Sequence, residues 1–580
     1  MNSSYIPIEH LLTADRLPNS VVAQYVDGTT LHWDDWRQRV AGWCTFLAGR
    51  DEQRWALYSQ DCIEFSVVLF ALWATNKTIY LAGDNQPDTQ RLLNEQVQGF
   101  IGGFDPAVVS HPVLDASDAH ASSETFDSSA PLDVVPARIM LFTSGSTGVP
   151  VLIEKSFGQL SREVTTLDTC WGEGLRGASV ISTVSHLHIY GLLFRLLWPL
   201  AAGMPFQQRT CQYTEDILLA ATGSAALVLV SSPSHLARLP AQLPWDEMRS
   251  RLRAVFSSAA PLSYEAAQVV HSRLLMYATE VFGSSETGGI GWRQQRSVDE
   301  PWQLFAGVRI KAQADTQRLE LQSPNLQTGD WWLADDLVEL VSADAFHLRG
   351  RIDTIVKIEG KRVSLTALER YLTAHPFVLQ ARVIDRQTRR DASAALVVLN
   401  VDGLDCLQTQ GKRALNQLFT EHLLQHVEAV VVPKHWRFLT RMPNNQQGKT
   451  PRALLDMFFE EGAGRRQLPR VSLFDNINEQ TWEIAMYIPD DLLFFDGHFT
   501  QSPILPGMAM IFWVEHYARV LFQVSTGFAN VRRLKFQKVV RPQQALHCTL
   551  TFLPSSNSVS FRYQSDIGIH SSGTMRFQPS

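Results

Sequence analysis

Residues 141–150 read LFTSGSTGVP, where an apolar strand end runs into hydroxyl side chains and two glycines. Such a loop can turn its backbone N–H groups and hydroxyls toward a phosphate, because glycine tolerates positive φ and allows close approach. An ordinary Ser/Gly turn has the same composition, so both readings stay open for the loop alone. A Walker loop is excluded, because GK[ST] does not follow here and QGKT at 447–450 has Pro443 in place of the first glycine.

The chain on either side of this loop alternates short apolar runs with longer helical patterns. Up to residue 350 the runs include VVLFALWA and AALVLVSS, and PLSYEAAQVVHSRLLMYA is a helical pattern. This alternation predicts a large α/β domain over 1–350. The same pattern on a smaller scale predicts a small α+β domain over 351–459. The polar stretch EEGAGRRQLPR at 460–470 predicts a linker, and one helix among strands predicts a third, α+β domain over 471–580.

Composition excludes several functional classes. The 580 residues carry a formal net charge of -7 with 19% charged residues, so nothing in the balance favours a nucleic-acid partner. No run of about 18 apolar residues predicts a membrane span, and the N-terminal stretch lacks the pattern of an export signal. The six cysteines form no CxxC pair, which favours reduced thiols in the cytoplasm over disulfides or a structural zinc site.

Five further stretches, together with the 141–150 loop, follow one another in the order and approximate spacing of a known motif series. Over about residues 20–460 the chain resembles the adenylate-forming enzymes, that is, acyl- and aryl-CoA ligases and acyl carrier protein ligases. The five stretches are SSAAPLS (257–263), VFGSSETGG (281–289), QTGDWW (327–332), GRIDTIVKIEGKRV (350–363) and NNQQGKTPR (444–452).

The resemblance implies ATP and Mg²⁺ as cofactors and a role for each matching residue. Lys449 would neutralise charge on the reacting oxygens, Glu286 would hold Mg²⁺, and Asp353 would lie at the hinge of the small domain. The Lys449 ammonium and the Mg²⁺ ion suit the chemistry, because negative charge accumulates on the α-phosphate when a carboxylate attacks it. The implied ATP and AMP contacts fall into four groups. The phosphate loop supplies Thr143, Ser144, Gly145, Ser146, Thr147 and Gly148, and the adenine segment within SSAAPLS supplies Ser258, Ala259 and Ala260. The phosphate-contacting turn supplies Gly283, Ser284 and Thr287, and Asp330 and Arg351 would hold the ribose.

The sequence departs from the family pattern just after the loop. The family usually has a lysine after the proline, whereas Val151 follows Pro150 here and the next lysine is Lys155. We expect either a weaker grip on the triphosphate or compensation by Lys155.

The acid itself is less constrained by the sequence. His188 matches a family position that borders the acyl pocket, with core packing as an equal alternative. Aromatic residues at Trp171, Tyr190, Phe194 and Phe282 would suit an aryl or medium-chain acyl acid, although aromatic residues more often belong simply to a core.

Residues 471–580 resemble the hotdog-fold 3-hydroxyacyl carrier protein dehydratases. The resemblance rests on FFDGHFTQSPILPG (494–507), a following helix and LKFQKVVRPQQALHCTLTF (534–552). In those enzymes a histidine takes the proton α to the thioester, and an acid 14 residues later, from the other subunit of a dimer, handles the departing hydroxyl. His498 matches the histidine, but the acid position is Phe512, which cannot transfer a proton. Glu515, three residues further on the helix, is the candidate substitute, although a surface or interface glutamate is the slightly favoured alternative. Asp496 is a weaker candidate, because at its position it would rather orient the imidazole or face solvent.

The two resemblances together predict an ATP-dependent ligase that forms an acyl-AMP and passes the acyl group to a phosphopantetheine thiol. Acyl carrier protein is the expected acceptor, because a carrier-bound chain would serve both halves of the protein, and free CoA is the alternative. We expect a homodimer through the hotdog domain. By analogy, this fusion resembles the fusions and gene neighbourhoods of bacterial aryl polyene and fatty-acid-like biosynthetic pathways. A degenerate scaffold, in which the hotdog domain serves dimerisation or carrier docking, is the competing hypothesis.

Overall fold

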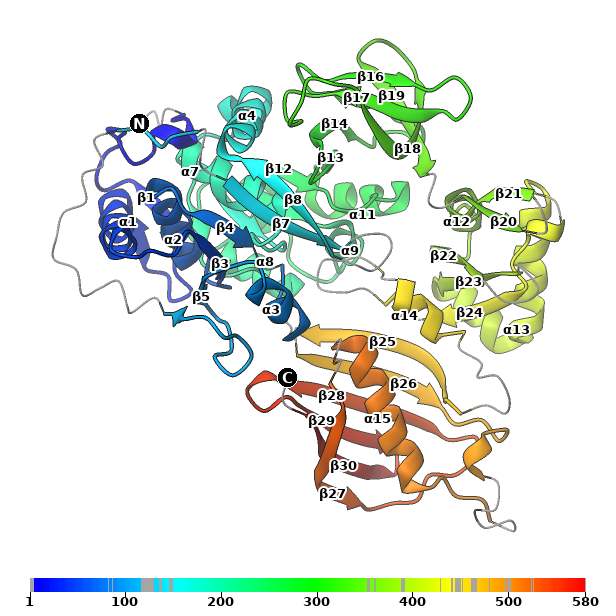
Figure 1. The fold of residues 1–580 in the computed structure, drawn as a ribbon. Coiled ribbons are helices and arrows are strands. Elements are labelled where there is room, and N and C mark those ends of the chain that lie inside the picture. Colours follow the sequence, from blue (N-terminus) through cyan, green and yellow to red (C-terminus); the bar gives the residue numbers. More distant parts are fainter. Residues whose placement is uncertain are drawn as a thin grey trace. The chain divides into compact units, whose positions relative to one another are not determined.

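The protein folds into two compact units, which are described separately. The computed structural model describes residues 5–81, 83–85, 87–115, 130–134, 138–144, 150–351, 355–358, 361–386, 392–427, 429–439, 442–443, 450, 452–459, 467–478, 480–495, 498, 502–522, 524 and 526–578. The first unit comprises Met1–Asn85 and Thr89–Arg349, and the second comprises Gln86–Asp88 and Gly350–Ser580 (Figure 1).

The first unit contains a six-stranded, mainly parallel sheet. Its strands in spatial order are β6 (Val113–Leu114), β5 (Gly99–Gly102), β3 (Arg54–Tyr58), β4 (Thr78–Leu81), β7 (Arg138–Ser144) and β8 (Pro150–Ser156). Only the β7–β8 pair is antiparallel, which makes these two strands a hairpin around the 145–149 stretch. The helix α2 (Cys62–Ala74) is apolar nearly all round and buried, as expected of a core helix.

A larger sheet of thirteen strands makes up the rest of the first unit. Its central strands β10, β9, β11, β12 and β13 are parallel, and β14 begins an antiparallel extension. In spatial order the strands are β16 (Arg309–Ala312), β17 (Arg318–Gln322), β18 (Trp332–Leu340), β19 (Ala345–Arg351), β15 (Trp302–Leu304), β14 (Gly288–Gln294), β13 (Thr279–Ser284), β12 (Leu252–Ser257), β11 (Leu227–Ser231), β9 (Ser179–Ser182), β10 (Phe206–Gln207), β1 (Val21–Gln24) and β2 (Thr30–His32).

Side-chain caps fix where several helices of this unit begin. The carboxylate of Asp61 accepts from the first amides of α2, and Ser156 with Gln159 forms a capping box on α4. Ser263 caps α11, so the stretch between β12 and α11 is held at both ends. The helical segments are η1 (Ile8–His10), α1 (Trp33–Ala48), α3 (Pro87–Asn94), α4 (Phe157–Leu167), η3 (Asp168–Gly172), α5 (Glu173–Leu175), α6 (Ile189–Gly191), η4 (Leu192–Leu197), α7 (Trp198–Ala202), α8 (Thr214–Ala220), α9 (Pro233–Leu236), α10 (Asp246–Arg249) and α11 (Tyr264–Leu274).

The second unit begins with two small sheets and their helices. One sheet pairs β20 (Ile355–Ile358) with β21 (Lys361–Ser364), and the other orders β22 (Val378–Arg386), β23 (Ala392–Leu399) and β24 (His435–Leu439). Leu368, Leu372 and Phe419 are buried between helices and sheet. The helical segments are α12 (Leu365–Thr373), α13 (Val401–Leu424), η6 (Ala429–Val431) and α14 (Arg452–Met457).

The C-terminal part of the second unit is a six-stranded antiparallel sheet with one long helix packed against it, α15 (Gly507–Leu521) (Figure 1). The buried face of α15 includes Met510, Trp513, Val514 and Tyr517. This arrangement confirms the predicted hotdog architecture. In spatial order the strands are β25 (Arg470–Asn478), β26 (Thr481–Tyr487), β28 (Ala545–Leu553), β29 (Ser558–Ser565), β30 (Gly568–Phe577) and β27 (Phe528–Phe536), with short turns η7 (Leu493–Phe495) and η8 (Pro554–Ser556).

One hydrophobic core joins the three-stranded sheet to the hotdog sheet. The buried cluster runs from Leu396 of β23 through Phe458, which follows α14, to Phe474 of β25. The rings of Phe458 and Phe474 meet edge to face with centroids 5.3 Å apart, and the indole Nε1 of Trp513 donates to the Gln467 carbonyl (2.8 Å). The packing therefore continues across the predicted linker region.

Among the described residues, no helix is both long enough and apolar enough to cross a membrane.

Candidate active sites

The predicted phosphate loop lies between the two strands of the β7–β8 hairpin. Thr143 is paired with Val151 and Ser144 with Pro150 in the strand register. Gly145, Ser146, Thr147 and Gly148 lie outside the described residues. The structure thus places the backbone on both sides of the loop at the carboxyl end of β7, where parallel sheets commonly bind ligands.

The predicted adenine segment, Ser258, Ala259 and Ala260, leaves the carboxyl end of β12. The Ser258 hydroxyl donates to the Val281 carbonyl on the neighbouring parallel strand β13 (2.7 Å). Ala259 has φ +73°, a left-handed conformation that costs a residue with a Cβ about 1–2 kcal/mol. Such strain persists only where the surrounding contacts impose it, which marks this segment as a candidate site.

The turn between β13 and β14 carries the predicted phosphate and magnesium residues. The Ser284 amide donates to the Thr287 hydroxyl, and the Thr287 amide donates to the Ser284 hydroxyl (both 3.2 Å). Thr287 is buried, whereas Gly283 and Ser284 are exposed. The start of this turn is therefore exposed to solvent. The buried Thr287 stabilises the turn through its two hydrogen bonds with Ser284.

Glu286 is the predicted magnesium ligand of this turn. Its side chain is partly exposed, and no hydrogen bond or ion pair joins its carboxylate to another described residue, although the ammonium of Lys155 lies close enough to interact with its charge. A carboxylate oxygen with open coordination suits Mg²⁺, which prefers hard oxygen ligands and keeps several waters. The residues present therefore fit the cofactor that the sequence predicts.

The ammonium of Lys155 is bound by two backbone carbonyls. Lys155 is buried, and its Nζ donates to the backbone carbonyls of Glu286 (3.0 Å) and Asn325 (3.2 Å). Burial lowers the pKa of Lys155, while the carboxylates of Glu163 and Glu286 oppose that shift. The first hydrogen bond braces the turn that carries Glu286, and the second ties the lysine to the segment that follows β17. The ammonium is thus committed to these carbonyls, and whether Lys155 compensates for Val151 or the grip on the triphosphate is weaker stays a prediction.

We expect Lys155→Met to destabilise the protein and to weaken its response to Mg²⁺. The substitution keeps most of the length of the side chain but removes the ammonium that makes both bonds, which costs about 1–3 kcal/mol for the carbonyls left behind. Urea unfolding measures the first effect, and the Mg²⁺ concentration for half-maximal ATP turnover measures the second.

Lys77→Met is the matched control for this prediction. Lys77 is also buried and donates to a backbone carbonyl, that of Arg50 (2.8 Å). We expect Lys77→Met to lower stability with an unchanged Mg²⁺ requirement. An equal shift of the Mg²⁺ requirement in both variants would contradict the bracing role of Lys155.

The remaining predicted ATP residues lie at strand ends. Asp330 is exposed in the turn before β18, and Arg351 is the exposed last residue of β19. Lys449 and the hinge residue Asp353 lie outside the described residues, so their roles stay predictions.

Three of the four aromatic candidates for the acid pocket gather in one cluster. The ring of Phe194 lies 5.0 Å from Tyr190 and 6.4 Å from Trp171 between centroids. Trp171 and Phe194 belong to the π-helical segments η3 and η4, a rare geometry that often marks functional sites. Phe282 instead packs against Trp302, with ring centroids 5.6 Å apart.

The two histidines of the HLHIYGLL stretch have different surroundings. His186 is buried, its Nε2 donates to the Ser59 carbonyl (2.9 Å), and Arg195 Nη1 lies 3.1 Å from its Nδ1. Burial and Arg195 lower the pKa of His186 well below its usual value. The ring of His188 lies against Gly83, where an added Cβ would come within 2.9 Å of it. The sequence analysis singled out His188, but it did not identify His186, whose buried ring contacts both Ser59 and Arg195.

The hotdog domain presents His498 in a form suited to a base. Its Nδ1 donates to the Ile504 carbonyl (2.8 Å), so in the neutral ring the lone pair is on Nε2. Phe512, at the position of the expected acid, is 41% exposed, and its ring centroid lies 5.9 Å from that of Phe494. Glu515 forms an ion pair with Arg519 one helical turn on (2.7 Å). Its catalytic role stays a prediction, as does that of Asp496, which lies outside the described residues.

Two family models match the chain. The model described as "AMP-binding enzyme" matches residues 12–316, and the model described as "ApeI dehydratase" matches residues 475–574. The second match covers β26, α15 and the strands after it, that is, most of the hotdog sheet.

Curated relatives match the N-terminal part. A 4-coumarate–CoA ligase of Cereibacter sphaeroides is 26% identical over 318 residues, which are 54% of this chain and 70% of the relative. A sulfoacetate–CoA ligase of Cupriavidus necator is 25% identical over 411 residues, 64% of this chain and 76% of the relative.

A solved structure supports the same fold. ATP-bound MatB from Rhodopseudomonas palustris aligns with a TM-score of 0.67 at 18% identity, over 80% of this chain and 99% of that one.

Proposed function

The chain belongs to the AMP-binding enzymes, and from this premise we propose that it activates an aryl or acyl carboxylic acid and passes it to the phosphopantetheine thiol of an acyl carrier protein. At the coarser level it is an adenylate-forming acid–thiol ligase fused to an ApeI-like dehydratase domain of the hotdog type. The choice of acid and of acceptor is the proposal.

The proposed reaction has two steps. A carboxylate oxygen attacks the α-phosphorus of ATP and the bond to pyrophosphate breaks, which gives an acyl-AMP. The thiol sulfur then attacks the acyl carbonyl, loses its proton and displaces AMP. In the first step Lys449 would neutralise charge on the attacking and phosphate oxygens, and the loop from Thr143 to Gly148 would hold phosphate through its amides and hydroxyls. Mg²⁺ bound at Glu286 would supply further positive charge to the phosphates.

The observation that carries this proposal is the position of two predicted nucleotide segments on neighbouring parallel strands. The adenine segment follows β12 and the turn with Glu286 follows β13, and the Ser258 hydroxyl ties the first segment to the second strand (2.7 Å). Ligands of open α/β sheets bind at the carboxyl ends of such strands. Asp330 and Arg351 would hold the ribose.

The aromatic cluster supports an aryl acid. Trp171 and Phe194 come from the two π-helical segments and Tyr190 from α6, and offset or edge contacts between rings stabilise a bound aromatic group. A medium-chain acyl group would use the same apolar walls. The name of the 4-coumarate–CoA ligase relative agrees with the aryl alternative.

The fused dehydratase domain supports a carrier-bound product. A 3-hydroxyacyl chain reaches such a domain on a phosphopantetheine arm, so one carrier could serve loading and later dehydration. We place this chemistry in the cytoplasm, in a fatty-acid-like or aryl polyene pathway, where ATP is supplied and cysteines stay reduced. Transfer to free CoA is the alternative.

A second copy of the chain would complete the hotdog domain. The strand β27 lies at one end of the sheet order and is exposed along most of its length. Its apolar side chains Phe528, Leu534 and Phe536 are exposed, and unpaired edge strands with such side chains favour strand pairing with another chain. A homodimer through this edge is therefore part of the proposal.

Pyrophosphate exchange with ATP and a panel of aryl and acyl acids tests the ligase. We expect exchange with at least one aryl acid, followed by thioester formation with holo acyl carrier protein in preference to CoA. Equal use of CoA would favour the alternative acceptor. The absence of exchange with every acid would favour the degenerate scaffold.

A further inference from the structure

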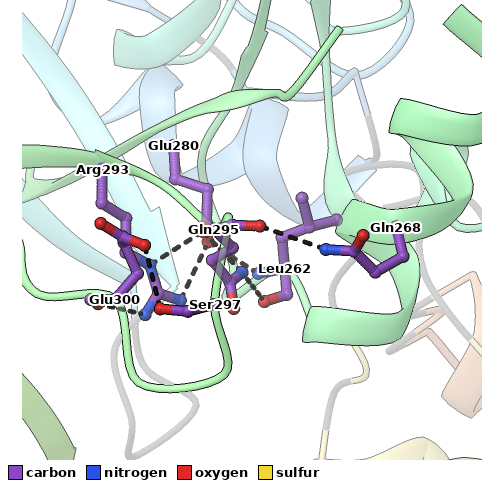
Figure 2. Close-up of polar contacts among 7 residues, drawn as sticks. All are labelled: Leu262, Gln268, Glu280, Arg293, Gln295, Ser297 and Glu300. Atoms are coloured by element: carbon purple, nitrogen blue, oxygen red, sulfur yellow. Dashed lines mark hydrogen bonds and ion pairs between the residues drawn. The ribbon is translucent and has the colours of Figure 1, made fainter. Parts of the chain in front are cut away.

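A buried polar cluster is hydrogen-bonded to the backbone of the predicted adenine segment, taken here as residues 258–262. Glu280, at the start of β13, and Gln295, just after β14, are almost fully buried. Glu280 Oε2 accepts from the Leu262 amide (3.1 Å), and Gln295 Nε2 donates to the Leu262 carbonyl (2.7 Å). Figure 2 shows these side chains converging on the Leu262 backbone. Both backbone groups of one residue in the segment are thus held by side chains.

The carboxylate of Glu280 is saturated with donors. Oε1 accepts from Arg293 Nε (2.9 Å) and Gln295 Nε2 (2.6 Å), and Oε2 accepts from Arg293 Nη2 (3.4 Å) as well as from Leu262. Burial raises the pKa of Glu280, and the guanidinium of Arg293 opposes that shift. A carboxylate can accept from all these donors with its two oxygens, whereas an amide would turn its own NH₂ toward one of them.

Arg293 is itself fixed. Its guanidinium lies 4.5 Å above the Trp302 ring centroid, and Nη1 donates to the Glu300 carbonyl (3.4 Å). Gln268 of α11 donates to the Gln295 carbonyl (3.3 Å), which ties the cluster to the helix that follows the segment (Figure 2). The cluster therefore connects β13, β14 and α11.

These contacts hold the chain on both sides of Ala259, the residue with positive φ. Ser258 is tied to β13 on one side of Ala259, and Leu262 is tied to Glu280 and Gln295 on the other. A residue with a Cβ at φ +73° relaxes unless its neighbours are held, so the two ties impose the shape of the segment.

We propose that Glu280 and Gln295 are positioning residues for nucleotide recognition, which hold the 258–262 segment in its strained shape through the Leu262 backbone. This inference rests on the proposed function, in which the segment contacts adenine. It assigns to the cluster a role in choosing ATP over other nucleoside triphosphates, because a base edge is read by groups fixed within a fraction of an ångström.

Glu280→Gln and Gln295→Met test this role. We measure equilibrium dissociation constants of the full chain for ATP and GTP by titration calorimetry, and KM and kcat for ATP by pyrophosphate exchange. Both variants should weaken ATP binding about tenfold, the scale of one lost hydrogen bond in a fixed site, and reduce the preference for ATP over GTP by a similar factor. The KM for ATP should rise more than kcat falls. Gln295→Met keeps the carboxylate, so it remains informative if Glu280→Gln fails to fold.

Glu369→Gln is the matched control. Glu369 is a largely buried carboxylate of α12 that accepts from the Val383 amide (2.9 Å) and from Arg382 (3.3 Å). It should lose stability without a change in the ATP-to-GTP ratio. If the Glu280 and Gln295 variants lose only stability in the same way, the positioning role is wrong.

The calorimetric readout separates this inference from the proposed function. A protein that prefers ATP and loses that preference in the variants, yet exchanges no pyrophosphate, would support the cluster and refute the ligase. A protein that binds ATP and GTP equally would refute the cluster's role in selection.

Discussion

Lys449→Ala is expected to reduce adenylate formation by about two to three powers of ten, the scale of losing one preorganised charge in the transition state. Negative charge grows on the α-phosphate as the carboxylate attacks, and one ammonium is assigned to that charge. ATP binding should change little, because the β7–β8 loop, the adenine segment and Asp330 are untouched. Pyrophosphate exchange measures the first effect and calorimetric titration with ATP the second.

Lys434→Ala provides the control for this experiment. Lys434 is an exposed lysine of the same small domain, next to β24. Its loss should leave exchange unchanged. Wild-type exchange in Lys449→Ala would remove Lys449 from the proposed mechanism.

Phe512→Asp is expected to raise the conversion of a 3-hydroxyacyl carrier protein to its enoyl form by about two powers of ten, within the range of a positioned general acid. His498 already carries its lone pair on Nε2 through the bond from Nδ1 to Ile504. The missing function is a proton donor for the departing hydroxyl, and Phe512 occupies the predicted position. Glu515 is held by Arg519, so we expect the unmodified domain to dehydrate weakly.

Phe512→Asn separates proton transfer from shape. It has the size of aspartate but cannot donate a proton as an acid, so it should not gain activity. Robust dehydration by the unmodified protein that is lost in Glu515→Gln would contradict this prediction and make Glu515 the acid.

The fold and the order of the nucleotide segments could be predicted from the sequence, because both depend on local patterns. Alternating apolar runs and helical patterns indicated the α/β layers, and the motifs 257–263 and 281–289 lie at the carboxyl ends of the neighbouring parallel strands β12 and β13. The histidine loop indicated the hotdog domain, which the sheet of 470–577 confirms.

Contacts between distant residues could not be predicted in the same way. Leu262 and Gln295 are 33 positions apart, and Lys155 reaches carbonyls 131 and 170 positions away. A buried polar cluster has no periodic signature, since its members come from different elements and each resembles an ordinary surface residue in the sequence. The aromatic cluster had a partial signature, but only packing separated Phe282 from Trp171 and Phe194.

The shared core of the second unit restricts how such a fusion can be recombined between genes. Phe458 contacts Phe474 across the predicted linker, and Arg437 of β24 lies over the ring of Phe459 (5.0 Å) and donates to the Phe458 carbonyl (2.9 Å). A crossover within codons 460–466 would combine Phe458 and Phe459 of one parent with the hotdog sheet of another parent. That sheet would have evolved against different residues at these two positions. Viable chimeras should therefore exchange residues from about 452 onward as one block, so that the inherited cassette begins at α14 rather than at β25.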